Sequence, residues 1–398
     1  MAKSILYIHQ YYNSPSMGGS TRSHEFAKRF TNKGYDVLIL TIDRTGFQRS
    51  DHSDSLFNYK VVWIPIEYDN SFTFIGRSYA FIKFSILSCL YIIKNRPDFI
   101  LATSTPLTVA IPALFSRFFF KIPYIFEVRD LWPEIPIAVG AIKNRFLIRV
   151  LKFLESMAYK HANGVVALSP GMANGILHVC PLCNVVVIPN SCDAMFKDNI
   201  TIPVRFQELY QNFNGAPSIV YAGAFGKINK VEYLVDLAYE LSLIGSSIKI
   251  VLFGKGSDTK YLKDKSASLG LLGNSVFIYD PIPKSDMPAI YKLSTAVSSV
   301  FDDIPEMQNN SSNKFFDGLA ASKPIIINFG GWMHDLITVN NAGISLWGIS
   351  TSEAAAILDQ NLNDHNWIRS ASISSGKISR QFDRDLLAKK YLDLLKHS

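Results

Sequence analysis

The sequence predicts an α/β protein made of two doubly wound domains, each with a parallel sheet covered on both faces by helices. The chain has 398 residues, of which 48% are hydrophobic, so it is long and apolar enough for two full-sized cores. Short continuous apolar runs alternate with helical segments, which is typical of strands buried on both faces of a parallel sheet. The alternation lapses between Asn190 and Ala216 and then begins again. We therefore expect two domains that face each other across a cleft.

The first half of the chain contains a series of candidate strands. A polar loop and a helix from about Ser20 to Asn32 follow the first strand. The apolar runs are Ser4–His9, Val37–Ile42, Lys60–Ile64, Phe99–Thr103, Tyr124–Val128, Val165–Leu168 and Val185–Ile188. Together they predict an N-terminal Rossmann-like domain over residues 1–193.

A second series of strands follows a linker, which we place at residues 194–215. The apolar runs are Ser218–Ala222, Ile248–Phe253, Val276–Tyr279, Ala296–Val300 and Pro324–Asn328. They predict a C-terminal Rossmann-like domain over residues 216–370. Residues 371–398 read as one or two helices, which can pack back on the N-terminal domain.

Charge and cysteine content narrow the possible partners and the compartment. A net charge of +7 and a pI near 9.0 suit an anionic partner, such as a nucleotide, a membrane surface or a nucleic acid. Four cysteines do not suggest a disulfide framework in a chain of this length. The spacing of His178, Cys180, Cys183 and Cys192 is metal-like but lacks a second tight pair, so we expect buried thiols and no metal site.

The beginning of the chain enters a strand directly and lacks a signal-peptide pattern. The longest apolar run, Phe84 to Ile93, is preceded by Lys83 and is too short to span a bilayer. We therefore expect a cytosolic protein that is at most peripheral to a membrane.

The segment Ser311–Asn328 is the most informative part of the chain. Ser312 or Asn313 can cap a short amphipathic helix, whose first N–H groups are then able to bind an anion. Asp317 lies one turn further along this helix, where its carboxylate would face the same ligand-binding space as these amides. Amides for phosphates and a carboxylate for hydroxyls suit a nucleotide-sugar.

A second anion-ready turn follows the strand Ser218–Ala222. Gly223 and Gly226 let the backbone approach a ligand closely, and Lys227 and Lys230 provide cations for phosphates. Two such turns in one run of alternating strands and helices are a much stronger signal than either alone.

With these segments placed, the chain resembles the family 4 glycosyltransferases of the GT-B fold over nearly its whole length. The motifs that carry the resemblance are Gly18-Gly19, Ile188-Pro189-Asn190, Tyr221-Ala-Gly223 with Gly226-Lys227, and Asn313–Asp317 with Lys323-Pro324. The resemblance implies retaining, metal-independent transfer of a sugar from a nucleotide-sugar in the cleft between the domains. It also implies an acceptor-binding N-terminal domain and a donor-binding C-terminal domain.

The run Arg129-Asp-Leu-Trp-Pro-Glu134, with Ala138–Asn144 after it, narrows this resemblance. It is similar to the bacterial N-acetyl-L-fucosaminyltransferases that build O-antigen and capsule repeat units. The resemblance implies UDP-N-acetyl-L-fucosamine as the first guess for the donor.

The sequence departs from the wider family at the donor site. The family commonly has two glutamates separated by seven residues, and the matching positions here are Asn309 and Asp317, with Glu306 nearby. The usual phosphate-binding arginine is Lys227, and the usual second lysine is out of register, although Lys230 is close. These changes keep much of the charge but put the identity of the donor in doubt.

The candidate donor-binding residues share positions on the two anion-ready turns or beside them. They are Gly223, Gly226, Lys227, Lys230, Glu306, Asn309, Ser312, Asn313, Lys314 and Asp317. Lys227 and the helix amides would stabilise the departing diphosphate, and Asp317 would accept the ribose hydroxyls. The alternatives are that Lys227 and Lys314 are solvated surface lysines and that Asp317 only interacts with the helix dipole.

The candidate acceptor-binding residues lie after the first and the fifth strands of the N-terminal domain. Asn13, Gly18, Gly19 and Arg22 lie between the first strand and its helix, where Arg22 can meet an acceptor phosphate or the loop can be a plain turn.

Glu127, Arg129, Asp130 and Glu134 cluster around the end of the buried strand Tyr124–Val128. Arg129 can bind a phosphate or carboxylate, and Asp130 or Glu134 can bind acceptor hydroxyls, which makes these two acids, with Lys227, the candidate catalytic residues. The alternative is an internal ion-pair network that holds the loop of Trp132.

Two segments are candidates for membrane contact. Leu114–Lys121 combines aromatic side chains with cations, including Arg117, Phe118, Phe119 and Lys121. In the second, the cations Arg145, Arg149 and Lys152 are spaced along one helical face, opposite the apolar residues Phe146, Val150 and Leu154. Either segment can instead be an amphipathic helix that covers the sheet.

These observations and the resemblance predict a retaining glycosyltransferase at the inner face of the cytoplasmic membrane. We expect transfer from a UDP-sugar to a polyprenyl-diphosphate-linked saccharide, without a cofactor and without a nucleic-acid partner. No side chain is assigned as catalytic base, because the departing diphosphate can assist removal of the acceptor proton. The alternatives are a nucleotide-sugar epimerase of the same fold and a non-catalytic nucleotide-sugar-binding subunit.

Overall fold

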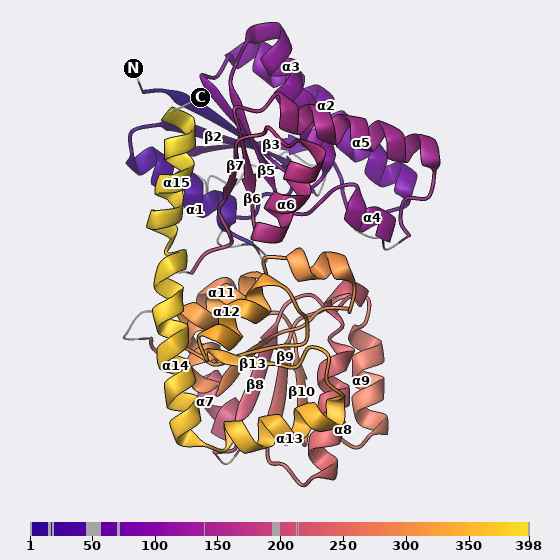
Figure 1. Ribbon diagram of the computed structural model, residues 1–398, viewed down its shortest axis with the longest axis vertical. Coiled ribbons are helices and arrows are strands. Elements are labelled where there is room, and N and C mark those ends of the chain that lie inside the picture. Colours follow the sequence, from indigo (N-terminus) through magenta and orange to yellow (C-terminus); the bar gives the residue numbers. More distant parts are fainter. Residues whose placement is uncertain are drawn as a thin grey trace. The chain divides into compact units, whose positions relative to one another are not determined.

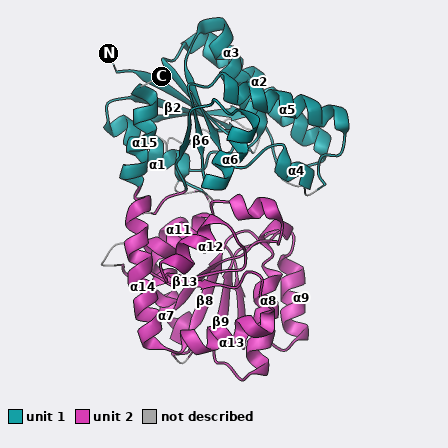
Figure 2. Ribbon diagram, in the orientation of Figure 1, with its two compact units in different colours: residues 1–14, 20–189, 384–398 teal, residues 15–19, 190–383 magenta. Residues whose placement is uncertain are grey.

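A computed structural model describes residues 2–14, 17, 20–44, 57–69, 72–138, 140–192, 200–211, 213 and 215–396 (Figure 1). The chain forms two compact units (Figure 2). Unit 1 contains residues 1–14, 20–189 and 384–398, and unit 2 contains residues 15–19 and 190–383. Apart from residues 15–19, the chain therefore passes from unit 1 to unit 2 after Pro189 and returns at Arg384.

Unit 1 is built on a seven-stranded parallel sheet with the strand order β3-β2-β1-β4-β5-β6-β7. The strands are β1 Ser4–Ile8, β2 Asp36–Asp43, β3 Lys60–Pro65, β4 Phe99–Thr103, β5 Tyr124–Val128, β6 Gly164–Ala167 and β7 Val185–Val187. All seven lie within or beside the runs expected from the sequence.

Helices cover both faces of this sheet, because successive strand residues point to opposite faces. Leu6 and Ile8 of β1 pack in one core with side chains of the helices on that face, whereas Ile5 and Tyr7 pack in the other core, with side chains of the first and last helices. The helices of unit 1 are α1 Arg22–Asn32, α2 Phe74–Asn95, α3 Ala110–Phe120, α4 Glu134–Ala138, α5 Arg145–Lys160, α6 Pro170–Val179 and α15 Arg384–Lys396.

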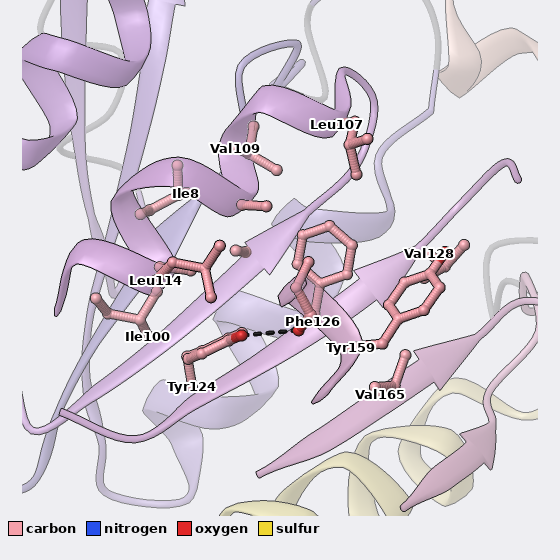
Figure 3. Packing of buried hydrophobic residues seen from close by; sticks show 14 of the residues in the cluster. Ile8, Ile100, Leu107, Val109, Leu114, Tyr124, Phe126, Val128, Tyr159 and Val165 are labelled. Carbon is pink, nitrogen blue, oxygen red and sulfur yellow. Dashed lines mark hydrogen bonds between the residues drawn. The ribbon is translucent and has the colours of Figure 1, made fainter. Parts of the chain in front are cut away.

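Figure 3 shows part of the first core, where Ile8, Ile100 and Phe126 of the sheet pack against Val109 and Leu114. Tyr124 is almost fully buried there and donates a hydrogen bond of 2.7 Å to the carbonyl oxygen of Ala158. Its phenol therefore ties β5 to α5 without leaving a buried polar group unsatisfied.

Unit 2 is built on a six-stranded parallel sheet with the order β10-β9-β8-β11-β12-β13. Its strands are β8 Ser218–Ala222, β9 Lys249–Phe253, β10 Val276–Tyr279, β11 Ala296–Ser299, β12 Ile325–Ile327 and β13 Gly343–Ser345. Its helices are α7 Val204–Gln211, α8 Glu232–Leu243, α9 Thr259–Ser268, α10 Met287–Leu293, α11 Asn313–Ala320, α12 Trp332–Val339, α13 Thr351–Leu362 and α14 His365–Ser379. Two parallel sheets with helices on them confirm the predicted α/β fold class.

Some elements differ from the expectation. Strand β13 was missed because it has only three residues, and α7 lies in the segment expected to be a linker. The expected free thiols at Cys180 and Cys183 are wrong, since these two cysteines form a disulfide.

Helix α2 also differs from the sequence-based view of the run Phe84 to Ile93. It has 22 residues, and by length and composition alone it could cross a membrane. Only 28% of its most apolar window is buried.

Strand order places the candidate sites within each unit. In unit 1 the order reverses between β1 and β4, and in unit 2 it reverses between β8 and β11. In doubly wound sheets, ligands bind at the carboxyl ends of strands next to such a reversal. The turns that follow β1, β4, β8 and β11 are therefore where functional side chains should gather.

Candidate functional site

In unit 2 the glycine turn after β8 meets the start of α11, as the two motifs predicted. A Cβ atom built on Gly223 would lie 3.0 Å from Nζ of Lys314 and 3.3 Å from the hydroxyl of Tyr221. A Cβ on Gly254, after β9, would lie 1.9 Å from the carbonyl oxygen of Gly223. Glycine is therefore required at position 254, where a Cβ would meet backbone, whereas a Cβ at Gly223 would crowd the end of the Lys314 side chain.

Lys314 is enclosed at this meeting point. Its Nζ lies 4.9 Å from the ring centroid of Tyr221 and 5.7 Å from that of Phe301, both within range of a cation–π interaction. Burial lowers the pKa of Lys314 to about 8, partly offset by the charge of Asp317. An anionic ligand beside Gly223 would stabilise the charged lysine and raise this pKa again.

The loop before α11 is held in place by several hydrogen bonds. The backbone N–H of Asn190 donates to Oγ of Ser311 at 3.0 Å, and Nε1 of Trp332 donates to the carbonyl oxygen of Asn310 at 2.8 Å. Ser312 is the N-cap residue, but its hydroxyl lies 2.8 Å from that of Ser299 and makes no capping bond to the helix. The first N–H groups of α11 are thus not capped by a side chain, which leaves them able to bind an anion.

Asp317 is buried on α11 and forms an ion pair with Lys284. Lys284 lies on the short 3-10 helix Lys284–Asp286, between β10 and α10. Sequence reasoning missed this lysine because it belongs to neither of the two motifs. A ribose bound by the Asp317 carboxylate would share that carboxylate with Lys284.

The remaining donor candidates lie around these groups. Lys227 is exposed and begins the 3-10 helix Lys227–Asn229, while Lys230 is 3.6 Å from the carboxylate of Glu232. Glu306 and Asn309 lie together on the 3-10 helix Pro305–Asn309, which precedes the loop of α11. Gly226 precedes Lys227 in an extended backbone conformation.

In unit 1 a polar cavity of about 180 Å³ opens at the carboxyl ends of the central strands. It is lined by His9, Tyr11, Asn13, Ser20, Arg44, Thr105, Arg129 and Asp130. Three of the predicted acceptor-side residues, Asn13, Arg129 and Asp130, are thus brought together. Gly18 and Gly19 lie outside the described residues.

His9 and Arg44 were not predicted as site residues, although each comes directly after a strand of the sheet. Nη1 of Arg129 donates to Nε2 of His9 at 3.0 Å, since a guanidinium has no acceptor. Nδ1 of His9 therefore carries the proton and faces Oγ of Ser23 at 2.9 Å. Burial, together with the charges of Arg129 and Arg44, holds the pKa of His9 well below its usual range, so the ring is neutral and orients Arg129.

Asp130 brings a titratable acid to this cavity. Burial raises the pKa of its carboxyl to about 6, although the charge of Arg129 opposes the shift. Arg44 lies across the cavity, where its Nη2 donates to Oδ1 of Asn13 at 3.3 Å. The cavity thus combines two guanidiniums, which suit an anionic group, with a carboxyl that can accept a hydrogen bond from a hydroxyl.

Arg22 and Glu127 form a buried ion pair at 2.9 Å and do not line this cavity. Arg22 also donates to the carbonyl oxygens of Ile188 and Pro189, and Glu127 accepts from Oγ1 of Thr103. The predicted charge cluster is therefore divided: Glu127 belongs to an internal network, whereas Arg129 and Asp130 line the cavity.

Glu134 is also directed elsewhere, toward α5. It lies at the start of α4, 3.9 Å from Nζ of Lys152. Nearby, the buried Glu155 accepts a hydrogen bond from the hydroxyl of Tyr159 at 3.0 Å. Burial and the charge of Glu134 raise the pKa of Glu155 to about 8.

The predicted membrane segments form α3 and α5, with one difference from the expected α5 surface. Phe146 and Val150 were expected on an apolar face opposite the cations, but they are 75% and 45% exposed. Phe153 is exposed as well, whereas Leu154 is half-buried. The exposed surface of α5 is therefore both apolar and cationic.

Known proteins support the expected family and share the fold. Residues 17–195 match the model of Glycosyltransferase Family 4. No curated protein sequence matches the chain.

Among solved structures, sucrose-phosphate synthase from Thermosynechococcus elongatus is 14% identical with a TM-score of 0.76, covering 99% of this chain and 98% of that one. HepE from Anabaena, in complex with UDP and glucose, is 16% identical with a TM-score of 0.72 and full coverage of both chains. WaaG, a glycosyltransferase involved in lipopolysaccharide biosynthesis, is 13% identical with a TM-score of 0.71, covering 98% of this chain and 99% of that one. The chain thus carries a Glycosyltransferase Family 4 segment on a fold of the GT-B type, and it is a glycosyltransferase.

Proposed function

We propose that this glycosyltransferase is retaining and transfers N-acetyl-L-fucosamine, or a related N-acetylated deoxysugar, from its UDP-linked form. The acceptor is a saccharide linked to a polyprenyl diphosphate, used in bacterial O-antigen or capsule synthesis. The observation that carries the donor side is Lys314, enclosed against Gly223 at the uncapped start of α11. The UDP in the HepE structure of the same fold supports the choice of nucleotide.

On the donor side, positive charge acts where negative charge grows. As the sugar leaves, the diphosphate gains charge, and Lys314, Lys227 and the first amides of α11 stabilise it more strongly than they stabilise the intact donor. Lys314 and the amides are already in place, because the hydrogen bonds of the preceding loop fix the start of α11. Asp317 accepts the ribose hydroxyls with its carboxylate.

On the acceptor side, the cavity of unit 1 binds and orients the acceptor. Arg44 and Arg129 hold an anionic group of the acceptor, for which a phosphate next to the lipid is the natural candidate. Asp130 accepts a hydrogen bond from an acceptor hydroxyl. Retention follows from attack on the face that the diphosphate leaves, and the departing diphosphate takes the proton of the acceptor hydroxyl.

The donor side needs no metal in this scheme, since lysines and helix amides supply the positive charge that Mg²⁺ would otherwise supply. The acceptor places the enzyme at the inner face of the cytoplasmic membrane. WaaG, with the same fold, is involved in lipopolysaccharide biosynthesis, which supports a role in cell-surface polysaccharide synthesis.

One experiment separates this proposal from its two alternatives. The purified protein is incubated, in excess EDTA, with UDP-N-acetyl-L-fucosamine and with related UDP-sugars, each with a synthetic polyprenyl-diphosphate saccharide. We expect free UDP and an acceptor longer by one sugar, with the anomeric configuration of the donor. A changed sugar without UDP release would show an epimerase, and binding without either product would show a non-catalytic subunit.

A further inference from the structure

Helix α2 is anchored in unit 1 by one of its faces. Ala80, Phe84, Ser88 and Ile92 recur every four residues, and each is at most 1% exposed. Three of them belong to the same core as the sheet, and the buried Ser85 donates a hydrogen bond of 3.0 Å to the carbonyl oxygen of Thr108. This face cannot leave the unit without exposing its core, so α2 does not cross a bilayer in the folded protein.

The opposite face of α2 is apolar and exposed along the length of the helix. Its large side chains follow each other at steps of three or four residues, which puts them in one stripe. This outer stripe consists of Ile75 (79% exposed), Tyr79 (65%), Ile82 (54%), Ile86 (55%), Leu90 (55%) and Ile93 (44%). At about 1.5 Å per residue it extends over about 27 Å, far more than the scattered apolar residues of an ordinary soluble surface.

The charge around the outer stripe is of one sign. Helix α2 contains Arg77, Lys83 and Lys94 and no acidic residue. Helix α3, which packs against α2, also lacks acidic residues and exposes Phe118 and Phe119. A second copy docked on the same face would bring these cations against their own copies, whereas an anionic lipid surface complements them.

We propose that α2 lies in the plane of the membrane, with its outer stripe inserted among the acyl chains of anionic lipids and its lysines reaching the headgroups. This deepens the proposed function, on whose lipid-linked acceptor it rests. Long cationic side chains beside an apolar stripe are typical of interfacial helices, because their aliphatic stems stay in the apolar layer while the charges stay in water. Helices α3 and α5 then add cations next to the inserted helix.

The test removes the apolar character of the stripe and leaves its cations in place. The variant Ile82→Glu/Ile86→Glu is compared with wild type and with a control, Leu243→Glu/Val339→Glu, which changes two exposed apolar residues of unit 2. The probes are vesicles of phosphatidylcholine alone and vesicles with one part phosphatidylglycerol to three parts phosphatidylcholine. We expect the stripe variant to bind the anionic vesicles at least about tenfold more weakly than wild type, and the control to bind like wild type.

Insertion is checked in the chain with Tyr79→Trp, whose fluorescence should be quenched by lipids brominated in the upper acyl chain. Part of wild-type binding should also survive high salt, because apolar insertion is not screened. Equal vesicle binding by all three proteins would overturn the inference. It would also be overturned if wild type were a dimer that the stripe variant converts to monomers without any loss of vesicle binding.

Thermal unfolding of each variant verifies that it is folded, which is expected because the changed side chains are exposed. Sugar transfer to a lipid-free acceptor keeps the inference separate from the proposed function. If no protein transfers a sugar while vesicle binding depends on the stripe, the proposed function is wrong and the inferred membrane surface is supported. If the stripe variant transfers and binds vesicles like wild type, only the membrane surface falls.

Discussion

The glycine turn of unit 2 and the cavity of unit 1 hold equivalent places in two similar sheets, but their chemistry differs. Around the turn, Lys314 lies near the aromatic rings of Tyr221 and Phe301 and against the backbone of Gly223. Around the cavity, Arg44, Arg129 and Asp130 project from strand ends and carry charges of both signs. The fold thus fixes where a ligand binds, while the side chains decide whether the place suits a diphosphate or a hydroxylated acceptor.

The largest effect is expected from removing the enclosed cation of unit 2. Lys314→Met should lower kcat/KM, with a loss of about 2–4 kcal/mol of transition-state stabilisation, and Lys227→Ala should lower it as well. The matched control is Lys323→Met, because burial also lowers the pKa of Lys323 to about 8, yet its Nζ donates to a backbone carbonyl outside the site. If steady-state kinetics gave the same loss for Lys314→Met and Lys323→Met, the turn would not be the diphosphate site.

The acid of the unit 1 cavity should reveal itself through the pH dependence of stability. Because the pKa of Asp130 rises from 3.8 to about 6 on folding, the folded state holds its proton more tightly, and stability is lost as pH rises between these values. Asp130→Asn should therefore be more stable than wild type above pH 6, by at most about 3 kcal/mol, with the gain disappearing below about pH 4. Urea unfolding at several pH values measures this, and a gain that does not change with pH would contradict a titrating Asp130.

The two sites should also separate in their Michaelis constants. Asp317→Ala should raise the KM of the UDP-sugar, and Arg129→Ala should raise the KM of the acceptor. Each increase should correspond to about 1.5–3 kcal/mol of lost binding free energy, the usual cost of a lost hydrogen bond to a charged group. Asp317→Glu keeps the carboxylate and should be milder than Asp317→Ala. If each substitution raised the KM of the UDP-sugar and the KM of the acceptor equally, the donor and acceptor would not bind at separate sites.

The smallest effect concerns the cations of α5. Each surface cation near an anionic membrane contributes about 1 kcal/mol, which salt screens. Arg145→Glu with Arg149→Glu should therefore weaken binding to anionic vesicles most at low salt, with turnover of a lipid-free acceptor unchanged. Sedimentation with vesicles at two salt concentrations measures this, and a loss that is the same at both would rule out a screened contact.

The sequence was sufficient for the parts of the fold and site that follow from local pattern. Apolar runs located β1 through β12, and glycines with a lysine indicated that the turn after β8 and the start of α11 would meet. In contrast, His9, Arg44 and Lys284 belong to none of the recognised motifs, and the side chains that each one meets depend on which strands are neighbours in the sheet.

Two further features depend on packing and could not be predicted from the periodicity of the sequence. The run Phe84 to Ile93 was expected to be too short to span a bilayer, because the sequence alone did not show that Phe74–Asn95 forms one helix. Arg22 was expected to meet an acceptor phosphate, but it forms a buried ion pair with Glu127, and the spacing of the two residues in the chain gives no hint of that contact.

That contact has a consequence for how the chain is made. The Glu127 carboxylate also accepts a hydrogen bond of 2.9 Å from the hydroxyl of Tyr391, so α15 supplies one of the partners of this buried carboxylate. During synthesis, the ribosome must therefore finish the whole of unit 2 before unit 1 receives its final element. Until then the nascent unit 1 lacks the aromatic cover of α15 over Phe26 and Phe30, and it is in this interval that a chaperone or a protease would find it.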